Sequence, residues 1–206
     1  IRDRSATAQV RYVDAKTGKD IIPPKTYAGE VDGSATIDKQ IDAMKSKGYN
    51  YSGVDSTGAP NYTDSTGTVK LTNAGQTIIY KFNDAQKSTI SVSNPTIEVG
   101  KPTSPISVTV TDNSSDPVKT TVTGLPDGLS FDSTTNTITG TPTHIGTTTV
   151  QVHSEDSTGN ASDSSFVITV KDSTGPTITQ ICNQSSEVYN PINPITISAT
   201  DNSGAK

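Results

Sequence analysis

The sequence has little cysteine, few aromatic side chains and no long apolar run. Among 206 residues there is one cysteine, Cys182, no tryptophan, and only 5% aromatic and 30% hydrophobic residues. A single cysteine excludes an internal disulfide framework. No apolar stretch approaches the roughly 20 residues that span a bilayer, and the charges, net −5, form no basic face. We therefore expect neither nucleic-acid binding nor membrane insertion.

The side chains that perform enzyme chemistry are scarce as well. The two histidines, His144 and His153, fall in an expected turn and on an expected strand, outside any Ser-His-Asp or metal-ligand pattern. Cys182 has no activating neighbour, and the glycine-rich stretches lack the lysine of a phosphate-binding loop. We therefore expect no catalytic residue and predict that the protein is not an enzyme.

Short alternating runs of valine, isoleucine and threonine are abundant from residue 88 onward. They are separated by turns rich in Gly, Pro, Asn and Asp, and about seven such runs predict a β-sandwich. The runs cover residues 89–93, 105–112, 118–124, 129–132, 137–140, 146–154 and 164–172. Since alternate residues of a strand face the same side, the expected core consists of Ile106, Val108, Val110, Val122, Leu129, Phe131, Ile138, Val150, Val152, Phe166, Ile168 and Val170.

The first 84 residues follow a different pattern. Runs at 8–14 and 21–24 flank a turn with Gly18, which indicates a hairpin. A helix is predicted after residue 34, capped by Ser34 or Thr36 and ended at Gly48, with Ile37, Ile41 and Met44 on one face. Further strands are expected at 66–71 and 75–82. Two strands, a helix and two strands in this order predict a β-grasp (ubiquitin-like) module.

One segment occurs twice. Residues 94–115 and 183–204 are identical at ten of twenty-two positions, with a constant offset of 89 residues. That offset suits one sandwich module, so a second copy is expected to begin near residue 173, and its roughly 34 residues are too few to bury a core alone. We predict a mainly β chain with three parts: a β-grasp module (1–84), a cadherin-like or Ig-like sandwich (85–172) and an incomplete second sandwich (173–206).

Acidic and amide side chains fall in particular loops of this predicted sandwich. In an Ig-like topology, the loop with Asp112 and Asn113 and the loop with Asp156 and Asn160 lie at the end where the chain enters, beside Asp84 of the linker. Ca²⁺ takes six to eight oxygen ligands from such groups. By the same reasoning, Asp172, which follows the last strand, is expected to lie opposite Asp201 and Asn202 of the repeat. The residues expected at metal sites are thus Asp84, Asp112, Asn113, Asp156, Asn160, Asp172, Asp201 and Asn202.

An alternative without metal remains open for these residues. Asp and Asn are common in β-turns because their side chains cap local backbone groups. The recurrence of Thr-Asp-Asn-Ser at a fixed offset and the acidic linkers favour metal. Glu98 and its repeat Glu187 fit either a metal ligand or a solvated strand position. We predict calcium at one or more module junctions.

Residues 124–150, GLPDGLSFDSTTNTITGTPTHIGTTTV, resemble a bacterial cadherin-like, immunoglobulin-type module. The segment AQVRYVDAKTGKDI is similar to the opening of β-grasp modules of the mucin-binding type. Together they resemble the stalk of the serine-rich surface adhesins of Gram-positive cocci. The resemblance implies a non-catalytic spacer, stiffened by Ca²⁺, on the outer surface of a bacterium and anchored to its cell wall. It also implies that the full-length protein binds a host glycoprotein or glycan.

Two alternatives concern direct binding by this chain. The β-grasp module could itself bind mucin or glycan through tyrosines such as Tyr12, Tyr49 and Tyr51, although tyrosines are also expected to fill a core that lacks tryptophan. Weak self-association through exposed sandwich edges is the other alternative. It would serve aggregation or biofilm formation.

Overall fold

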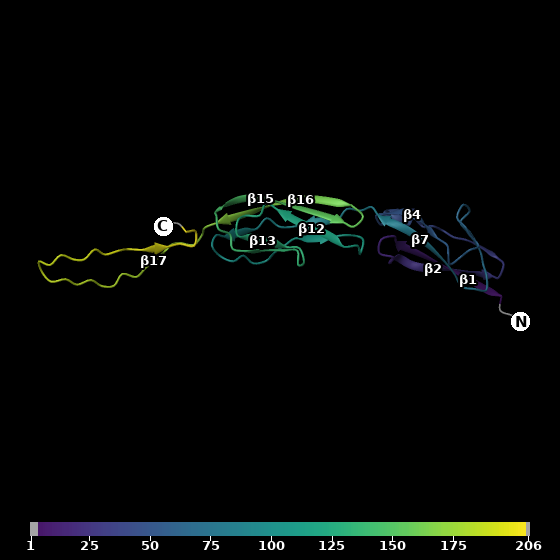
Figure 1. Cartoon of the computed structure of the whole chain (residues 1–206), viewed down its shortest axis with the longest axis horizontal. Coiled ribbons are helices and arrows are strands. Elements are labelled where there is room, and N and C mark those ends of the chain that lie inside the picture. Colours follow the sequence, from purple (N-terminus) through teal and green to yellow (C-terminus); the bar gives the residue numbers. More distant parts are fainter. Residues whose placement is uncertain (1–3, 205–206) are drawn as a thin grey trace. The chain divides into compact units, whose positions relative to one another are not determined.

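The computed structural model describes residues 4–204, which divide into two compact units. The first unit comprises the chain up to Thr89 together with Thr111–Lys119 and Ser154–Ser162. The second comprises Ile90–Val110, Thr120–His153 and the described residues from Asp163 onward. Figure 1 shows strands connected by loops, with a C-terminal segment that is drawn mostly as coil. The protein is mainly β, as the sequence predicts.

The N-terminal residues form a four-stranded sheet in the order β2-β1-β7-β4. β1 pairs with β2 as an antiparallel hairpin and with β7 in parallel, and β4 pairs with β7 in antiparallel register. A smaller sheet has the order β3-β6-β5. The bounds are β1 Ser5–Asp14, β2 Asp20–Glu30, β3 Ser34–Thr36, β4 Tyr49–Asp55, β5 Tyr62–Thr63, β6 Thr68–Lys70 and β7 Gln76–Asp84.

The helix α1 is shorter than expected and covers only Ile41–Ser46. The residues predicted to cap it form strand β3 instead, which pairs with β6. Ile37 is buried although it precedes the helix, and Ile41 is 43% exposed, so the prediction that the two share a helical face was wrong. Gly48, with a φ of +87°, follows the end of the helix as expected. Among residues 4–204, no helix is long and apolar enough to cross a membrane.

The core of the first unit is rich in aromatic rings. Tyr12, Tyr80 and Phe82 are fully buried beside aliphatic residues such as Met44. The Tyr12 hydroxyl donates to the carbonyl of Asp38 at 2.7 Å. Because the chain has no tryptophan, tyrosine and phenylalanine rings provide the large buried aromatic surface in this core.

Every strand expected between residues 88 and 172 is present, and β9 is an additional one. Two sheets, β12-β15-β16-β9 and β10-β14-β13, and a β11-β8 pair enclose the core. All twelve expected core residues are buried or pack against it, and Ile97 and Val99 join them. The bounds are β8 Thr89–Ser91, β9 Thr96–Glu98, β10 Ile106–Ser107, β11 Thr109–Thr111, β12 Val118–Thr123, β13 Leu129–Asp132, β14 Thr137–Gly140, β15 Gly146–Asp156 and β16 Ala161–Lys171.

The segment after β16 is largely exposed and holds one short strand pair, β17 Thr177–Ile178 with β18 Ala199–Thr200. Val188 and Ile197 of the repeat are 80% and 67% exposed, whereas their counterparts in the first copy, Val99 and Val108, are 1% and 2% exposed. In the first copy, these positions belong to the packed core of the sandwich. That residues 173–206 begin a second sandwich stays a prediction, and Ala205 and Lys206 lie outside the described residues.

Candidate metal centre

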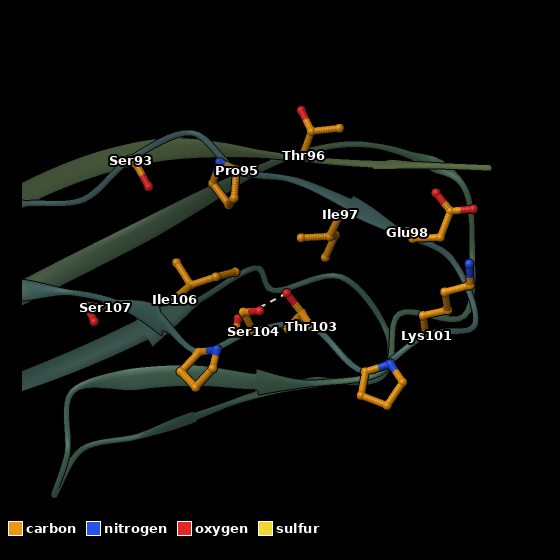
Figure 2. A pocket seen from close by; sticks show the side chains of 12 residues that line it. Ser93, Pro95, Thr96, Ile97, Glu98, Lys101, Thr103, Ser104, Ile106 and Ser107 are labelled. Carbon is orange, nitrogen blue, oxygen red and sulfur yellow. Dashed lines mark hydrogen bonds between the residues drawn. The ribbon is translucent and has the colours of Figure 1, made fainter. Parts of the chain in front are cut away.

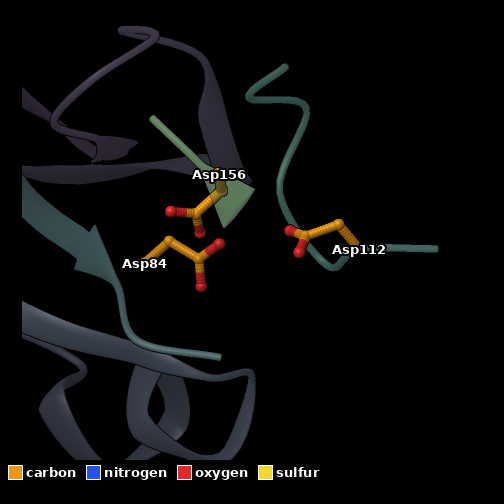
Figure 3. Close-up of side chains that lie close together, drawn as sticks. All are labelled: Asp84, Asp112 and Asp156. Carbon is orange, nitrogen blue, oxygen red and sulfur yellow. The ribbon is translucent and has the colours of Figure 1, made fainter. Parts of the chain in front are cut away.

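Three aspartates from separate segments meet in the first unit. Asp84 is the last residue of β7, Asp112 follows β11 and Asp156 ends β15. Each offers a carboxylate oxygen, and these oxygens lie within 4.8 Å of one another (Figure 3). Three carboxylates at this spacing repel one another, because unit charges a few ångströms apart interact strongly even at the reduced dielectric of a protein surface.

Asp84 is 5% exposed, and one of its two carboxylate oxygens accepts hydrogen bonds. Its Oδ1 accepts the backbone N–H of Gln86 at 3.0 Å and the side-chain amide of Asn113 at 3.1 Å. Its Oδ2 is buried and has no hydrogen-bond partner in the described chain. A buried, unpartnered acceptor is destabilising unless a donor or a cation satisfies it.

Asp112 presents a second oxygen of the same kind. Its Oδ1 accepts the N–H of Ser114 at 2.9 Å, and its Oδ2 is buried without a partner among residues 4–204. Burial raises the pKa of Asp112, and the negative charges of Asp84 and Asp156 raise it further. The ionised form is therefore disfavoured at this position, and a bound cation would favour it again.

Asp156 organises its own loop. Its Oδ1 accepts the backbone N–H groups of Thr158 and Asn160, both at 2.9 Å, and the hydroxyl of Thr158 at 2.7 Å. Gly159, at a φ of +91°, lets the loop turn back toward the carboxylate. Burial would raise the pKa of Asp156, but the hydrogen bonds from Asn160 and Thr158 outweigh it, and the pKa is lowered. This carboxylate thus stays ionised beside Asp112.

The two predicted asparagine ligands border the aspartates with their amide nitrogens. Asn113 Nδ2 donates to the carbonyl of Lys47 and to Asp84, each at 3.1 Å. Asn160 Nδ2 donates to the carbonyl of Asp84 at 3.1 Å and to Asp156 Oδ2 at 2.7 Å. Both amides therefore connect the loops to the end of β7, and their role as metal ligands stays a prediction.

The other predicted residues lie in the second unit, around Glu98. Its carboxylate accepts the N–H of Ser173 at 2.9 Å, the hydroxyls of Ser173 and Thr174 at 2.6 and 2.9 Å, and the amide of Asn202 at 3.2 Å. The hydrogen bonds from Ser173 are the main cause that lowers the pKa of Glu98 to about 2. Asp172 and Asp201 cap the turns that follow them. Within the described chain, the tight grouping of three acidic residues occurs only in the first unit.

Two further buried aspartates lie near the cluster: Asp14, which was not predicted there, and Asp116, which the sequence placed in the same loop as Asp112. Asp14 is buried at the end of β1 and accepts the hydroxyl of Ser114 at 2.7 Å. Ser114 lies 100 residues away in sequence, so no local sequence pattern predicts this contact. Asp116 is also buried and accepts a short hydrogen bond from Ser157, which joins the two loops. Its position in the same loop as Asp112 was the only available signal.

The tyrosines considered for ligand binding are mostly interior. Tyr12 and Tyr49 are 1% and 4% exposed, and Tyr51 is half-buried with Lys39 above its ring at 5.3 Å. A groove of about 510 Å³ in the second unit runs between β9 and residues 101–107 (Figure 2). Serine, threonine, proline and isoleucine line it together with the charged residues Glu98 and Lys101, and no aromatic residue does. It lacks the rings that commonly line ligand pockets.

Three comparisons show which known proteins the chain resembles. Residues 86–171 match the family described as "Putative Ig domain". Over 97% of its length the chain is 58% identical to the "Serine-rich adhesin for platelets" of Staphylococcus aureus strains MRSA252 and USA300, of which it spans 15% and 9%. Among solved structures, it is similar to human CDH23 EC21-23 with 15% identity and a TM-score of 0.42, covering 95% of this chain and 78% of that one.

Proposed function

We propose that the chain is a non-catalytic stalk segment of a serine-rich surface adhesin; what supports this is its 58% identity, over 97% of its length, to a serine-rich adhesin. It would carry no binding pocket of its own and would hold a binding module away from the bacterial cell wall. The chain spans only 9–15% of the relatives. Recognition of a host glycoprotein or glycan, and anchoring to the cell wall, therefore belong to the proposal for the whole protein.

The proposal includes calcium at the three aspartates. Asp84 and Asp112 each hold a buried oxygen that lacks a partner within residues 4–204, and Asp156 adds an ionised carboxylate. Oxygen-only sites rich in carboxylates suit Ca²⁺, which accepts irregular geometry and can complete its six to eight ligands with backbone carbonyls and water. The single observation that carries the proposal is the pair of orphaned carboxylate oxygens directed into one acidic cluster.

Calcium at this place would fix the connection between β7 and β8. The ligands would come from the end of β7 and from two loops that belong to the same first unit. In the metal-free chain, repulsion among three carboxylates favours separation of these segments. With the cation bound, the same charges draw the segments together, so residues 84–89 become less mobile. A stalk gains stiffness in this way without a disulfide.

The N-terminal module is assigned as a β-grasp in the same proposal. What supports the assignment is the mixed sheet β2-β1-β7-β4, whose central strands β1 and β7 run parallel, with a short helix in the connection between the two hairpin-like halves. Glycan binding by this module has weaker support because Tyr12 and Tyr49 are buried. The role we favour for it is that of a spacer that supplies Asp84.

Calorimetric titration of the whole chain with CaCl₂ tests the calcium site. We expect saturable binding that is lost in Asp84→Asn, a substitution that keeps an acceptor for Gln86. The matched control is Asp132→Asn, since Asp132 caps a turn in the second unit and is remote in sequence from the cluster. Small-angle scattering with calcium and with chelator should give a narrower distribution of dimensions with calcium. A wild-type chain that takes up no calcium would refute the proposal.

A further inference from the structure

Asp14 is a buried carboxylate next to the aspartate cluster that does not belong to it. It is 3% exposed and ends β1. Its Oδ1 accepts the N–H groups of Lys16 and Thr17 at 2.8 and 3.0 Å, and its Oδ2 accepts the hydroxyl of Ser114 at 2.7 Å. Both oxygens therefore accept hydrogen bonds, and Asp14 is not among the three carboxylates whose oxygens lie within 4.8 Å of one another.

Ser114 connects Asp14 to the cluster. Its backbone N–H donates to Asp112 Oδ1 at 2.9 Å, and its hydroxyl oxygen accepts the N–H of Asp116 at 3.1 Å. The serine thus uses its hydroxyl proton on Asp14, its hydroxyl oxygen on Asp116 and its amide on Asp112. With Oδ1 held in this way, Asp112 directs its unpartnered Oδ2 into the buried interior.

We propose that Asp14 is a positioning residue for the cation site: by holding Ser114, it places Asp112 within reach of Asp84 and Asp156. This inference rests on the proposed calcium function. A hydrogen bond to an ionised acceptor is about twice as strong as a neutral one, so Asp14 restrains a loop that would otherwise be free to move its carboxylate away from two like charges. The end of β1 thereby becomes part of the site, 100 residues before the loop that it holds.

The competing explanation is that Asp14 only caps the turn after β1. Such a role would affect folding of the turn but would leave calcium affinity unchanged. Asp14→Asn separates the two roles, since its remaining side-chain oxygen can still accept the turn N–H groups. Its NH₂ group cannot accept the Ser114 hydroxyl proton and can only donate, to a hydroxyl oxygen that already accepts the N–H of Asp116. Asp55 provides a matched control, because it too ends a strand and caps the following turn through Thr57.

The experiment is a double-mutant cycle on the whole chain, with calcium dissociation constants measured by titration calorimetry. Asp14→Asn should weaken binding about tenfold, and Ser114→Ala at least as much, because it removes the bond to Asp14 and also the acceptor for the N–H of Asp116. The double variant should be no weaker than Ser114→Ala, because that substitution already removes the bond to Asp14. Ser114→Thr retains the hydroxyl and should bind like the wild type, as should Asp55→Asn. The amide resonances of residues 112–116 should shift in Asp14→Asn but not in Asp55→Asn.

The outcomes separate this inference from the function on which it rests. If the wild type binds calcium and Asp14→Asn binds it equally well, the positioning role is refuted while the calcium site stands. If the effects of the two substitutions simply add, Asp14 and Ser114 act independently and the proposal is likewise wrong. If the wild type binds no calcium, the calcium function fails and this inference fails with it. Should Asp14→Asn not fold, Ser114→Ala and Ser114→Thr decide the matter.

Discussion

The two acidic clusters of this chain satisfy their carboxylates in different ways. Around Glu98, hydroxyl and amide donors from Ser173, Thr174 and Asn202 occupy both oxygens of a half-buried carboxylate. Around Asp84 and Asp112, two oxygens are buried and have no partner within the described residues. The two clusters have similar residue types in the sequence, but they differ in whether hydrogen-bond donors satisfy all of their buried carboxylate oxygens. The Glu98 cluster also has one unpartnered buried atom, the amide oxygen of Asn202, but within the described residues only the Asp84 cluster has buried carboxylate oxygens without a partner. That difference supports our proposal of a cation at the Asp84 cluster.

The largest expected contrast comes from removing one carboxylate from each cluster. Asp156→Ala deletes the acceptor of four hydrogen bonds in a partly buried loop. Since a buried hydrogen bond to a charged group contributes about 1.5–3 kcal/mol and such losses are not additive, we expect a destabilisation of about 3 kcal/mol. Asp201→Ala in the other cluster should change little. Urea unfolding of both variants in chelator measures the difference, and equal losses would contradict the contrast.

The strands of the sandwich could be predicted well from the sequence because local signals agree with the packed fold. β13 and β14 have the predicted bounds, since Gly and Asn at positive φ mark the turns around them. β9 was missed because three residues between a proline and a glycine carry little periodicity. The helix was drawn too long because β3 is held by pairing with β6, which lies more than 30 residues later in the chain.

The site was predictable only in part. Topology placed Asp112 and Asp156 in loops at the end where the linker enters, and these residues do lie with Asp84. No pattern could show that Glu98 collects donors from residues 75 or more positions away, or that Asp14 holds Ser114. Contacts of this kind depend on which loops meet after folding, and their residue types are also those of ordinary turns.

Calcium itself should produce the next largest effect. A ligand that binds only the folded state raises its stability by about 2.7 kcal/mol at a hundredfold excess over the dissociation constant. We expect that gain in the wild type and in Asp201→Asn, and its loss in Asp84→Asn. Hydrogen exchange with and without calcium locates the effect, and protection should rise in residues 84–89, 111–119 and 154–162. Equal gains in all three proteins would place the calcium elsewhere.

The pH dependence of stability should have opposite signs in the two clusters. Because the pKa of Asp112 is raised in the folded state, its contribution is present below the ordinary value near 3.9 and is lost as pH rises through the raised pKa. In chelator, Asp112→Asn should therefore be more stable than the wild type at pH 7, because the substitution removes a charge that burial and the neighbouring carboxylates disfavour. With calcium the order should reverse, because the substitution removes a ligand. Melting curves at pH 4 and 7 in both buffers test this.

Substitution of Glu98 should have the smallest effect on stability, and the stability that Glu98 contributes should depend on pH in the opposite direction from that of Asp112. Hydrogen bonds from Ser173 lower the pKa of Glu98 to about 2, so its contribution is present above the ordinary pKa of glutamate and is lost as the pH falls through about 2. Glu98→Gln should lower the melting temperature slightly at pH 7, by less than Asp84→Asn does in calcium. The side-chain carboxyl resonance of Glu98 should titrate near pH 2 in both chelator and calcium. A midpoint that moves when calcium is added would instead make Glu98 a metal ligand.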